Sequence, residues 1–170
     1  SDGSVKRIDC DALGVSGGWN PSVHLTCHMN GRPVWDPALA SFTPQPGAVP
    51  GLVAAGAAAG EMSTQGALAQ GQAEALTLAK ALGKRVKPST LPVADATPYE
   101  ITPFWDVGGT GRAWLDFQND VTVKDIKQAV QENFRSVEHM KRYTTQGMAT
   151  DQGKNSNVAA LAVLADATGR

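Results

Sequence analysis

Residues 121–134 read VTVKDIKQAVQENF, and this stretch predicts the first helix of a small helical module. Thr122 followed three residues later by Asp125 has the spacing of a capping box, which satisfies free backbone N–H groups at a helix start. The apolar residues that then share one helical face are Val123, Ile126 and Val130. Asn133 suits the left-handed position that ends a helix, so we expect the helix to stop there.

Two further helices are expected downstream. Ser136 is a favourable N-cap for the second helix, and Gly147 is expected to end it. The third helix is expected to start at Asn157. Its expected buried stripe is Val158, Leu161, Ala162 and Ala165. Three short helices joined by tight turns predict a compact all-α module.

The N-terminal half has the pattern of an α/β fold. Residues 8–16 form an apolar run that ends in two glycines, as a buried strand would end in a sharp turn. Residues 52–56 predict a second strand, and small residues connect it to a long helix expected over residues 63–82, with Gly83 after its end. A strand that leads into a helix in this way is one half of a βαβ unit.

Prolines divide the chain. Four prolines between residues 35 and 50 indicate a surface connection, preceded by a short helix over residues 22–28. We therefore expect an α+β protein: residues 1–83 are the C-terminal part of a dinucleotide-binding, Rossmann-like α/β domain, residues 84–112 a Pro/Gly-rich linker, and residues 113–170 the all-α module. Two strands and one helix cannot cover both faces of a parallel sheet, so we expect a slice of a larger polypeptide.

The composition and net charge of the chain exclude several classes of protein and of partner. Charged residues are 18% and hydrophobic residues 42% of the 170, which excludes a solvated disordered chain. The net charge of −1 provides no general attraction to nucleic acid or to an anionic membrane. Only Cys10 and Cys27 are cysteines, and no leader or long apolar run is present, so we expect reduced thiols and a cytoplasmic location.

No complete catalytic motif is present. The chain has no G-x-G-x-x-G, no P-loop and no nucleophile elbow. His24 and His28 could share a helical face near Cys27, but further zinc ligands are missing there, so we expect no metal site. Lys141, Arg142 and Lys154, with hydroxyls nearby, suit a phosphate or a flavin edge, or are simply a solvated face beside a helix C-terminus.

Four longer stretches of the sequence are more distinctive than these single residues and short motifs. These are DFQNDVT (116–122), SVEHMKRYTT (136–145) and GMATDQGK (147–154), together with SGGWNP (16–21). They resemble the alpha subunit of bacterial heterotetrameric sarcosine oxidase, of which the chain would be an internal fragment.

The resemblance implies a multi-subunit flavoenzyme that oxidises the N-methyl group of sarcosine. Its products are glycine, hydrogen peroxide and a one-carbon unit taken up by tetrahydrofolate. The alpha subunit would hold NAD non-covalently. The beta subunit would bind sarcosine and FAD, and would carry a covalent FMN at the alpha–beta interface, with gamma and delta subunits completing the tetramer. The fragment would have no activity alone, and neither nucleic acid nor a membrane is implied as a partner.

Two groups of residues are the candidates for cofactor contacts. Glycines that let backbone approach NAD closely are expected at Gly17, Gly18, Gly56 and Gly60, although tight packing alone would also explain them. The FMN-contacting set is expected to be Lys141, Thr144, Thr145, Thr150, Asp151, Gln152 and Gly153. The alternative function is a subunit-assembly module that docks the beta subunit without touching a cofactor.

The helical module also resembles a [2Fe-2S] domain, that of bacterioferritin-associated ferredoxin. The positions of its four cysteine ligands are occupied here by Asp116, Gln118, Asp151 and Ser156. None is a thiolate, which such clusters require. We therefore expect no iron–sulfur cluster, and electron transfer through one is the least favoured function.

Overall fold

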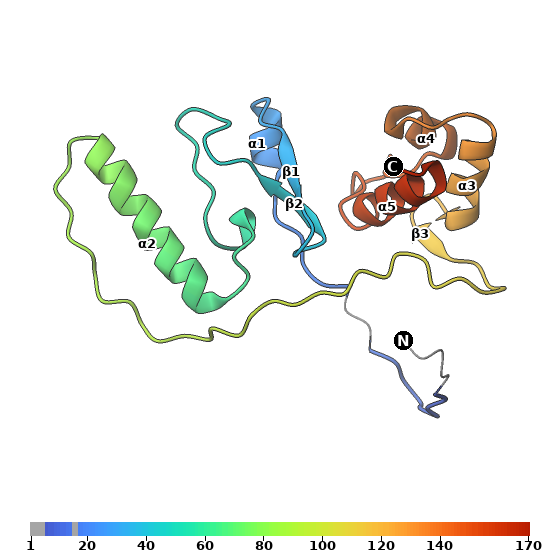
Figure 1. The fold of residues 1–170 in the computed structure, drawn as a ribbon, viewed down its shortest axis with the longest axis horizontal. Helices are drawn as coiled ribbons and strands as arrows, with labels where there is room; N and C mark the ends of the chain where they lie inside the picture. Colours follow the sequence, from blue (N-terminus) through green and yellow to red (C-terminus); the bar gives the residue numbers. More distant parts are fainter. Residues whose placement is uncertain (1–5, 15–16) are drawn as a thin grey trace. The chain divides into compact units, whose positions relative to one another are not determined.

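In the computed structural model, which describes residues 6–14 and 17–170, the chain combines helices with short strands (Figure 1). The helices are α1 (His24–His28), α2 (Thr64–Ala81), α3 (Val123–Gln131), α4 (Val137–Thr144) and α5 (Asn157–Thr168), with a 3-10 helix η1 (Gly56–Ala59). The strands are β1 (Pro33–Asp36), β2 (Ser41–Pro44), β3 (Trp114–Asp116) and β4 (Val121–Thr122). This mixture agrees with the expected α+β class. The chain divides into two compact units, Ser1–Ile101 and Thr102–Arg170.

The second unit starts its helices as the sequence predicts. Thr122 Oγ1 accepts a hydrogen bond from Asp125 N, and Thr122 N donates to Asp125 Oδ2 at 2.8 Å, which completes the capping box. Ser136 caps α4 by accepting from His139 N. Asn133 is left-handed, with a φ of 69°. The local helix signals of this module are confirmed.

The core of the second unit lies between its three helices and the β3–β4 hairpin. Its buried residues are Leu115, Val121, Val123, Ile126, Ala129, Met140, Ala160, Val163 and Leu164. Helix α3 packs against both α4 and α5. The buried face of α5 differs from the predicted stripe, because Ala160, Val163 and Leu164 are its buried residues. Helix α5 is apolar on nearly all sides, so periodicity alone could not select the face.

The first unit contains an antiparallel hairpin where the sequence analysis expects only a connection. Strands β1 and β2 pair with Asp36 opposite Ser41 and Pro33 opposite Pro44. The two prolines lie at the open end of the ladder, where a missing N–H does no harm, and Pro37 lies in the turn. The prolines between residues 35 and 50 therefore exclude a helix but not this short hairpin.

The two strands predicted for an α/β domain are wrong for the described residues. Residues 8–14 are not a strand, and residues 15–16 of that prediction lie outside the described part. Ala55 is extended, with φ −142° and ψ 161°, but residues 52–55 pair with no neighbouring strand in the described part of the chain. A strand requires a hydrogen-bonded neighbour, so an extended segment without one is not a strand.

Helix α2 confirms the long predicted helix. Ser63 caps it by accepting from Gly66 N at 3.0 Å, and Gly83 follows it with a φ of 70°. None of its residues is fully buried, and the predicted apolar stripe is only partly covered by the described residues: Leu68 and Ala79 are half-buried, whereas Ala75, Leu78 and Leu82 are exposed. Within residues 6–14 and 17–170, no helix combines the length and the apolar character that crossing a membrane requires.

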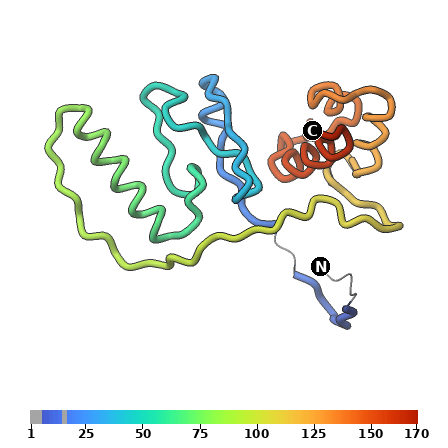
Figure 2. The backbone as a smooth tube through the Cα atoms, viewed as in Figure 1, coloured from blue at the N-terminus to red at the C-terminus, as the bar shows by residue number. Residues whose placement is uncertain are grey.

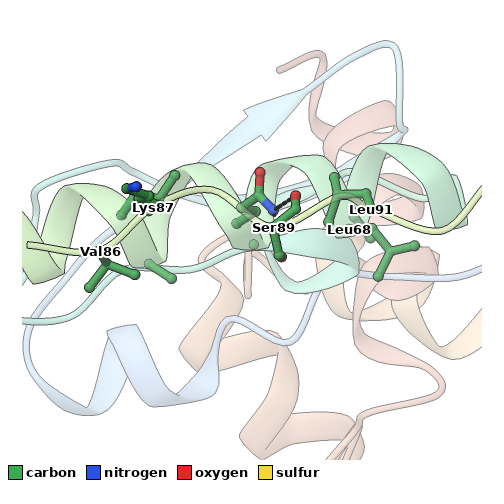
Figure 3. Close-up of a pocket in the computed structure, with 10 residues that line it drawn as sticks. Leu68, Val86, Lys87, Ser89 and Leu91 are labelled. Carbon is green, nitrogen blue, oxygen red and sulfur yellow. Dashed lines mark hydrogen bonds between the residues drawn. The ribbon is translucent and has the colours of Figure 1, made fainter.

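An extended segment returns along α2 after the helix ends (Figure 2). Gln72 Nε2 donates to the Ser89 carbonyl at 2.7 Å, and Ala94 N donates to Gln65 Oε1 at 2.9 Å. Between helix and segment lies an open cavity of about 440 Å³, whose lining includes Leu68 and Leu91 (Figure 3). The segment thus covers part of one helix face.

Candidate functional site

The loops at the N-terminal end of α5 converge on a buried carboxylate. Asp116, at the end of β3, is 2% exposed. Its Oδ1 accepts from Gln118 N at 2.9 Å and from Asn119 N at 3.3 Å. Its Oδ2 accepts from Gly147 N at 2.9 Å, across 31 residues. One side chain therefore joins the β3–β4 turn to the turn that follows α4.

A second buried polar pair links the α4 turn to the start of α5. Gln146 Nε2 donates to Ser156 Oγ at 2.7 Å, and the two side chains are 0% and 3% exposed. Gln146 Oε1 is buried and has no hydrogen-bond partner within the described residues. This pair holds the loop before α5 against the end of α4.

Two glycines make the close packing of these loops possible. Gly147 and Gly153 are buried and left-handed, with φ of 67° and 74°. A Cβ atom on either would collide with the side chain of Asn157, and one on Gly147 would also lie 3.2 Å from Gly153 Cα. Asn157 Nδ2 donates to the Gln152 carbonyl at 3.3 Å. Any other residue at these two positions would adopt a strained φ and would require the Asn157 side chain to move.

The predicted flavin residues on α4 and in its turn have different surroundings. Thr144 is half-buried, donates to the Met140 carbonyl at 2.8 Å and accepts from Gln146 N. Its hydroxyl therefore serves the helix end. Thr145 is exposed and left-handed, and its carbonyl accepts from Asn119 Nδ2 at 2.9 Å. Lys141 is half-buried and forms no ion pair with the described residues.

The end of α4 also differs from the prediction. The helix stops at Thr144, three residues before the expected Gly147. Bonds from Asn119 to the Thr145 carbonyl and from Gly147 N to Asp116 fix the chain in a turn that cannot continue a helix. Long-range contacts thus override the local stop signal.

The remaining predicted flavin residues form the loop between the Gly147 turn and α5. Thr150 and Gln152 are exposed, and Gln152 Nε2 donates to the Ala149 carbonyl at 2.8 Å. Asp151 Oδ1 accepts from Gly153 N at 3.1 Å. Asn157 contacts both Gly147 and Gly153, so the structure places this loop beside the α4 turn.

The four predicted nucleotide glycines are not assembled in one cradle by the described residues. Gly18 lies against Tyr99 and Ile101. Gly56 faces Ala67 of α2 and donates its N–H to Gln70 Oε1 at 2.8 Å, and a Cβ on Gly60 would lie 2.8 Å from Leu39 Cδ1. Packing within the chain thus accounts for three of them. Gly17 is exposed, with no atom within 4 Å of its Cβ position.

The positions expected to have lost cluster ligands have two different environments. Asp116 and Ser156 are buried and hydrogen-bonded, whereas Gln118 is exposed and Asp151 half-buried. Cys10 and Cys27 are exposed and free. Across residues 6–14 and 17–170 no three His, Cys, Asp or Glu side chains are grouped as metal ligands would be.

Glu132, the residue directly after α3, carries a carboxyl group whose pKa is shifted. The Tyr143 hydroxyl donates to Glu132 Oε2 at 2.6 Å, and this bond, helped by Gln128, lowers the pKa of Glu132. The same bond raises the pKa of Tyr143. Phe134 stacks on the Tyr143 ring at 4.5 Å between centroids. This cluster stabilises the α3–α4 connection.

Sequence reasoning missed the residues that assemble the loops, namely Asp116 in this role, Asn119, Gln146 and Asn157. A signal was available for Asp116. The stretches WDPALAS (35–41) and LDFQNDV (115–121) form the same turn, with an aspartate that accepts from the N–H groups two and three residues later. Ala40 and Asp120 occupy the same left-handed position, with φ of 47° and 54°.

Comparison with known proteins first gives the class of the second unit. Residues 110–170 match the family model "Sarcosine oxidase A3 domain". Most of the second unit is therefore similar to an A3 domain of this family.

Relatives extend the match to nearly the whole chain. It is 42% identical to sarcosine oxidase subunit alpha of Rhizobium meliloti (strain 1021), over 98% of this chain and 17% of the relative. Identity to the subunits of the same name from Corynebacterium sp. strains P-1 and U-96 is 38% and 39%, over 98% of this chain and 18% of each relative. The chain belongs to the sarcosine oxidase alpha-subunit family and spans less than a fifth of the length of these relatives.

Proposed function

We propose that this chain is a non-catalytic part of a sarcosine oxidase alpha subunit that contacts NAD through its first unit and an interfacial FMN through its second unit. The parent enzyme would demethylate sarcosine to glycine with formation of hydrogen peroxide, together with beta, gamma and delta subunits. The observation that carries the flavin part is the loop cluster at the start of α5, where buried bonds fix exposed hydrogen-bonding groups.

The donor set fits the edge of a flavin ring, which presents carbonyl and nitrogen acceptors. Thr150 and Gln152 are exposed and carry a hydroxyl and an amide donor. Thr145 is also exposed, but its hydroxyl donates to the Thr144 carbonyl, so only its oxygen is available, as an acceptor for a ring N–H. Lys141 lies four residues before Thr145 and adds an ammonium group. Thr144 does not fit, because its hydroxyl both donates to the Met140 carbonyl and accepts from Gln146 N. We therefore restrict the proposed direct contacts to the exposed residues and Lys141.

Each group has a definable task in this proposal. FMN, when bound, would accept electrons from the FAD of the beta subunit. Lys141 would stabilise negative charge on the reduced ring through a charge-assisted bond. The Thr145 hydroxyl, which donates to the Thr144 carbonyl, would accept from a ring N–H and so fix the orientation of the ring edge, because the Thr145 backbone is itself held by Asn119.

Fewer of the predicted NAD-contacting glycines than of the predicted FMN-contacting residues are free to contact a cofactor. Gly56 already donates its N–H to Gln70, and Gly60 packs against Leu39, so both are explained within the chain. Gly17 is exposed and open, and a nucleotide could approach its backbone closely. We therefore assign the NAD contact in this chain to Gly17.

Thr145→Val in the assembled oxidase tests the flavin contact. The substitution keeps the size and β-branching of the side chain and removes only the hydroxyl. We expect a shifted FMN absorption spectrum or slower FAD-to-FMN transfer, with reduction of FAD by sarcosine unchanged. Thr168→Val is the matched control, because the Thr168 hydroxyl donates to the Leu164 carbonyl at the far end of α5.

The alternative, a docking module that touches no cofactor, is favoured by one observation. Helix α2 has 18 residues and none is buried, as expected if another part of the assembly covers it. In that case Thr145→Val would leave the FMN spectrum, its potential and the transfer rate unchanged in a correctly assembled tetramer. That result would overturn the proposed flavin contact.

A further inference from the structure

The β1–β2 turn and the β3–β4 turn have the same form, and comparing them distinguishes two roles of an aspartate side chain. In the β1–β2 turn, Asp36 Oδ1 accepts from Ala38 N at 2.9 Å and from Leu39 N at 3.3 Å. In the β3–β4 turn, Asp116 Oδ1 accepts from the equivalent N–H groups at the same two distances. One carboxylate oxygen is therefore enough to form the turn.

The second oxygen distinguishes the two turns. Asp36 Oδ2 has no hydrogen-bond partner among residues 6–14 and 17–170, and Asp36 is half-buried. Asp116 Oδ2 accepts from Gly147 N at 2.9 Å, and Asp116 is 2% exposed. This second bond does not shape its own turn. It fixes the left-handed turn that follows α4.

We propose that Asp116 is a positioning residue, which holds the Thr145–Gly147 turn in the one conformation that presents the loops beside α5 to the flavin. The proposal rests on the proposed function, since it concerns the same loops. Asn119 assists by holding the Thr145 carbonyl at 2.9 Å. The Asp116 carboxylate lies behind the loop and touches no cofactor.

The chemistry of an amide makes this role testable. In Asp116→Asn one carboxylate oxygen becomes an NH2 group. Whichever way the amide turns, that NH2 group faces a backbone N–H, either that of Gly147 or those of Gln118 and Asn119. In Asp36→Asn the oxygen can keep both turn bonds while the NH2 group occupies the unpartnered side. The second variant is therefore a matched control.

Both variants are placed in the full alpha subunit of the assembled oxidase. For Asp116→Asn we expect a changed circular-dichroism band of FMN and FAD-to-FMN transfer slower by about 10- to 100-fold, since a displacement of ~1 Å costs up to that much. Reduction of FAD by sarcosine should be unchanged. For Asp36→Asn we expect no change in either flavin readout.

Two results would overturn the positioning role. One is an Asp116→Asn subunit that melts earlier but whose FMN band and transfer rate per assembled molecule equal those of the wild type. The other is an equal flavin effect from Asp36→Asn. If Thr145→Val alters the flavin while Asp116→Asn does not, only the positioning role fails. If neither alters it, the proposed flavin contact fails as well.

A second variant keeps the test decisive if Asp116→Asn does not assemble. Asn119→Ala removes only the amide bond to the Thr145 carbonyl, from a half-buried side chain. A smaller shift of the same FMN band would support the positioning role. An unchanged band would overturn it.

Discussion

Replacing Gly153 by alanine should expose how tightly the loops beside α5 are packed. Gly153 has a φ of 74°, and a Cβ atom there would collide with the carboxamide of Asn157. The left-handed conformation costs an alanine about 1–2 kcal/mol. Overpacking adds about 1–3 kcal/mol. We therefore expect Gly153→Ala to lower the free energy of unfolding of the second unit by about 2–5 kcal/mol.

A double-mutant cycle with Asn157→Ala separates the two contributions. Asn157→Ala alone removes the 3.3 Å bond to the Gln152 carbonyl, which should cost about 1 kcal/mol. In the double variant the collision is absent, so the combined loss should be smaller than the sum by about 1–3 kcal/mol. Gly169→Ala is the control, because its φ is 70° and no atom lies within 4 Å of its Cβ position.

Hydrogen exchange of the α3 amides in the 170-residue chain measures these free energies, since α3 lies in the core of the second unit. The reasoning is refuted if the two single changes add within about 0.5 kcal/mol. It is also refuted if Gly153→Ala costs no more than Gly169→Ala. Either result would mean that Asn157 does not occupy the space in front of Gly153.

Two further predictions concern the nucleotide and the pH response. Gly17→Val in the full alpha subunit should reduce bound NAD per folded molecule without lowering the thermal midpoint, whereas Gly14→Val, also at an open position, should retain NAD. Equal NAD content in both would contradict the assignment. Tyr143→Phe should raise the pKa of Glu132 toward its ordinary value in an NMR titration, because the Tyr143 hydroxyl, helped by Gln128, lowers it. A carboxyl group whose pKa is lower in the folded state stabilises the fold at pH values above its unfolded-state pKa. This stabilisation is lost as the pH falls through the folded-state pKa, so Tyr143→Phe should lose less stability on acidification than the wild type does.

Signals that act within a few residues were predictable from the sequence. The Thr122–Asp125 capping box, the Ser136 cap and the left-handed Asn133 all appear as expected, because each concerns a backbone group at most three residues away. The start of α5 at Asn157 was also predicted, although the Ser156 side chain makes no cap bond there. Local backbone chemistry therefore determined most helix boundaries.

Features that depend on distant partners were not predictable. The bond from Gly147 N to Asp116 spans 31 residues, and no local pattern specifies it. The extended Ala55 could be predicted as strand-like, but strand formation depends on a neighbour that the described residues do not contain. The prolines near β1 and β2 led to the prediction of a connection without regular structure, so the hairpin, whose strands are only four residues long, was not predicted. In these regions, the presence or absence of a hydrogen-bonded partner determined the structure, rather than the local propensity of the residues.

The exposure of α2 has a calorimetric consequence. A helix with no fully buried residue uncovers less apolar surface when it melts than an enclosed core does, and uncovered apolar surface is the source of the heat-capacity increment of unfolding. On heating, α2 should therefore lose its helicity gradually and contribute little to the step in heat capacity. The second unit, with its enclosed core around Ile126 and Met140, should account for most of that step. A partner that covers α2 would reveal itself as an additional heat-capacity increment in the complex.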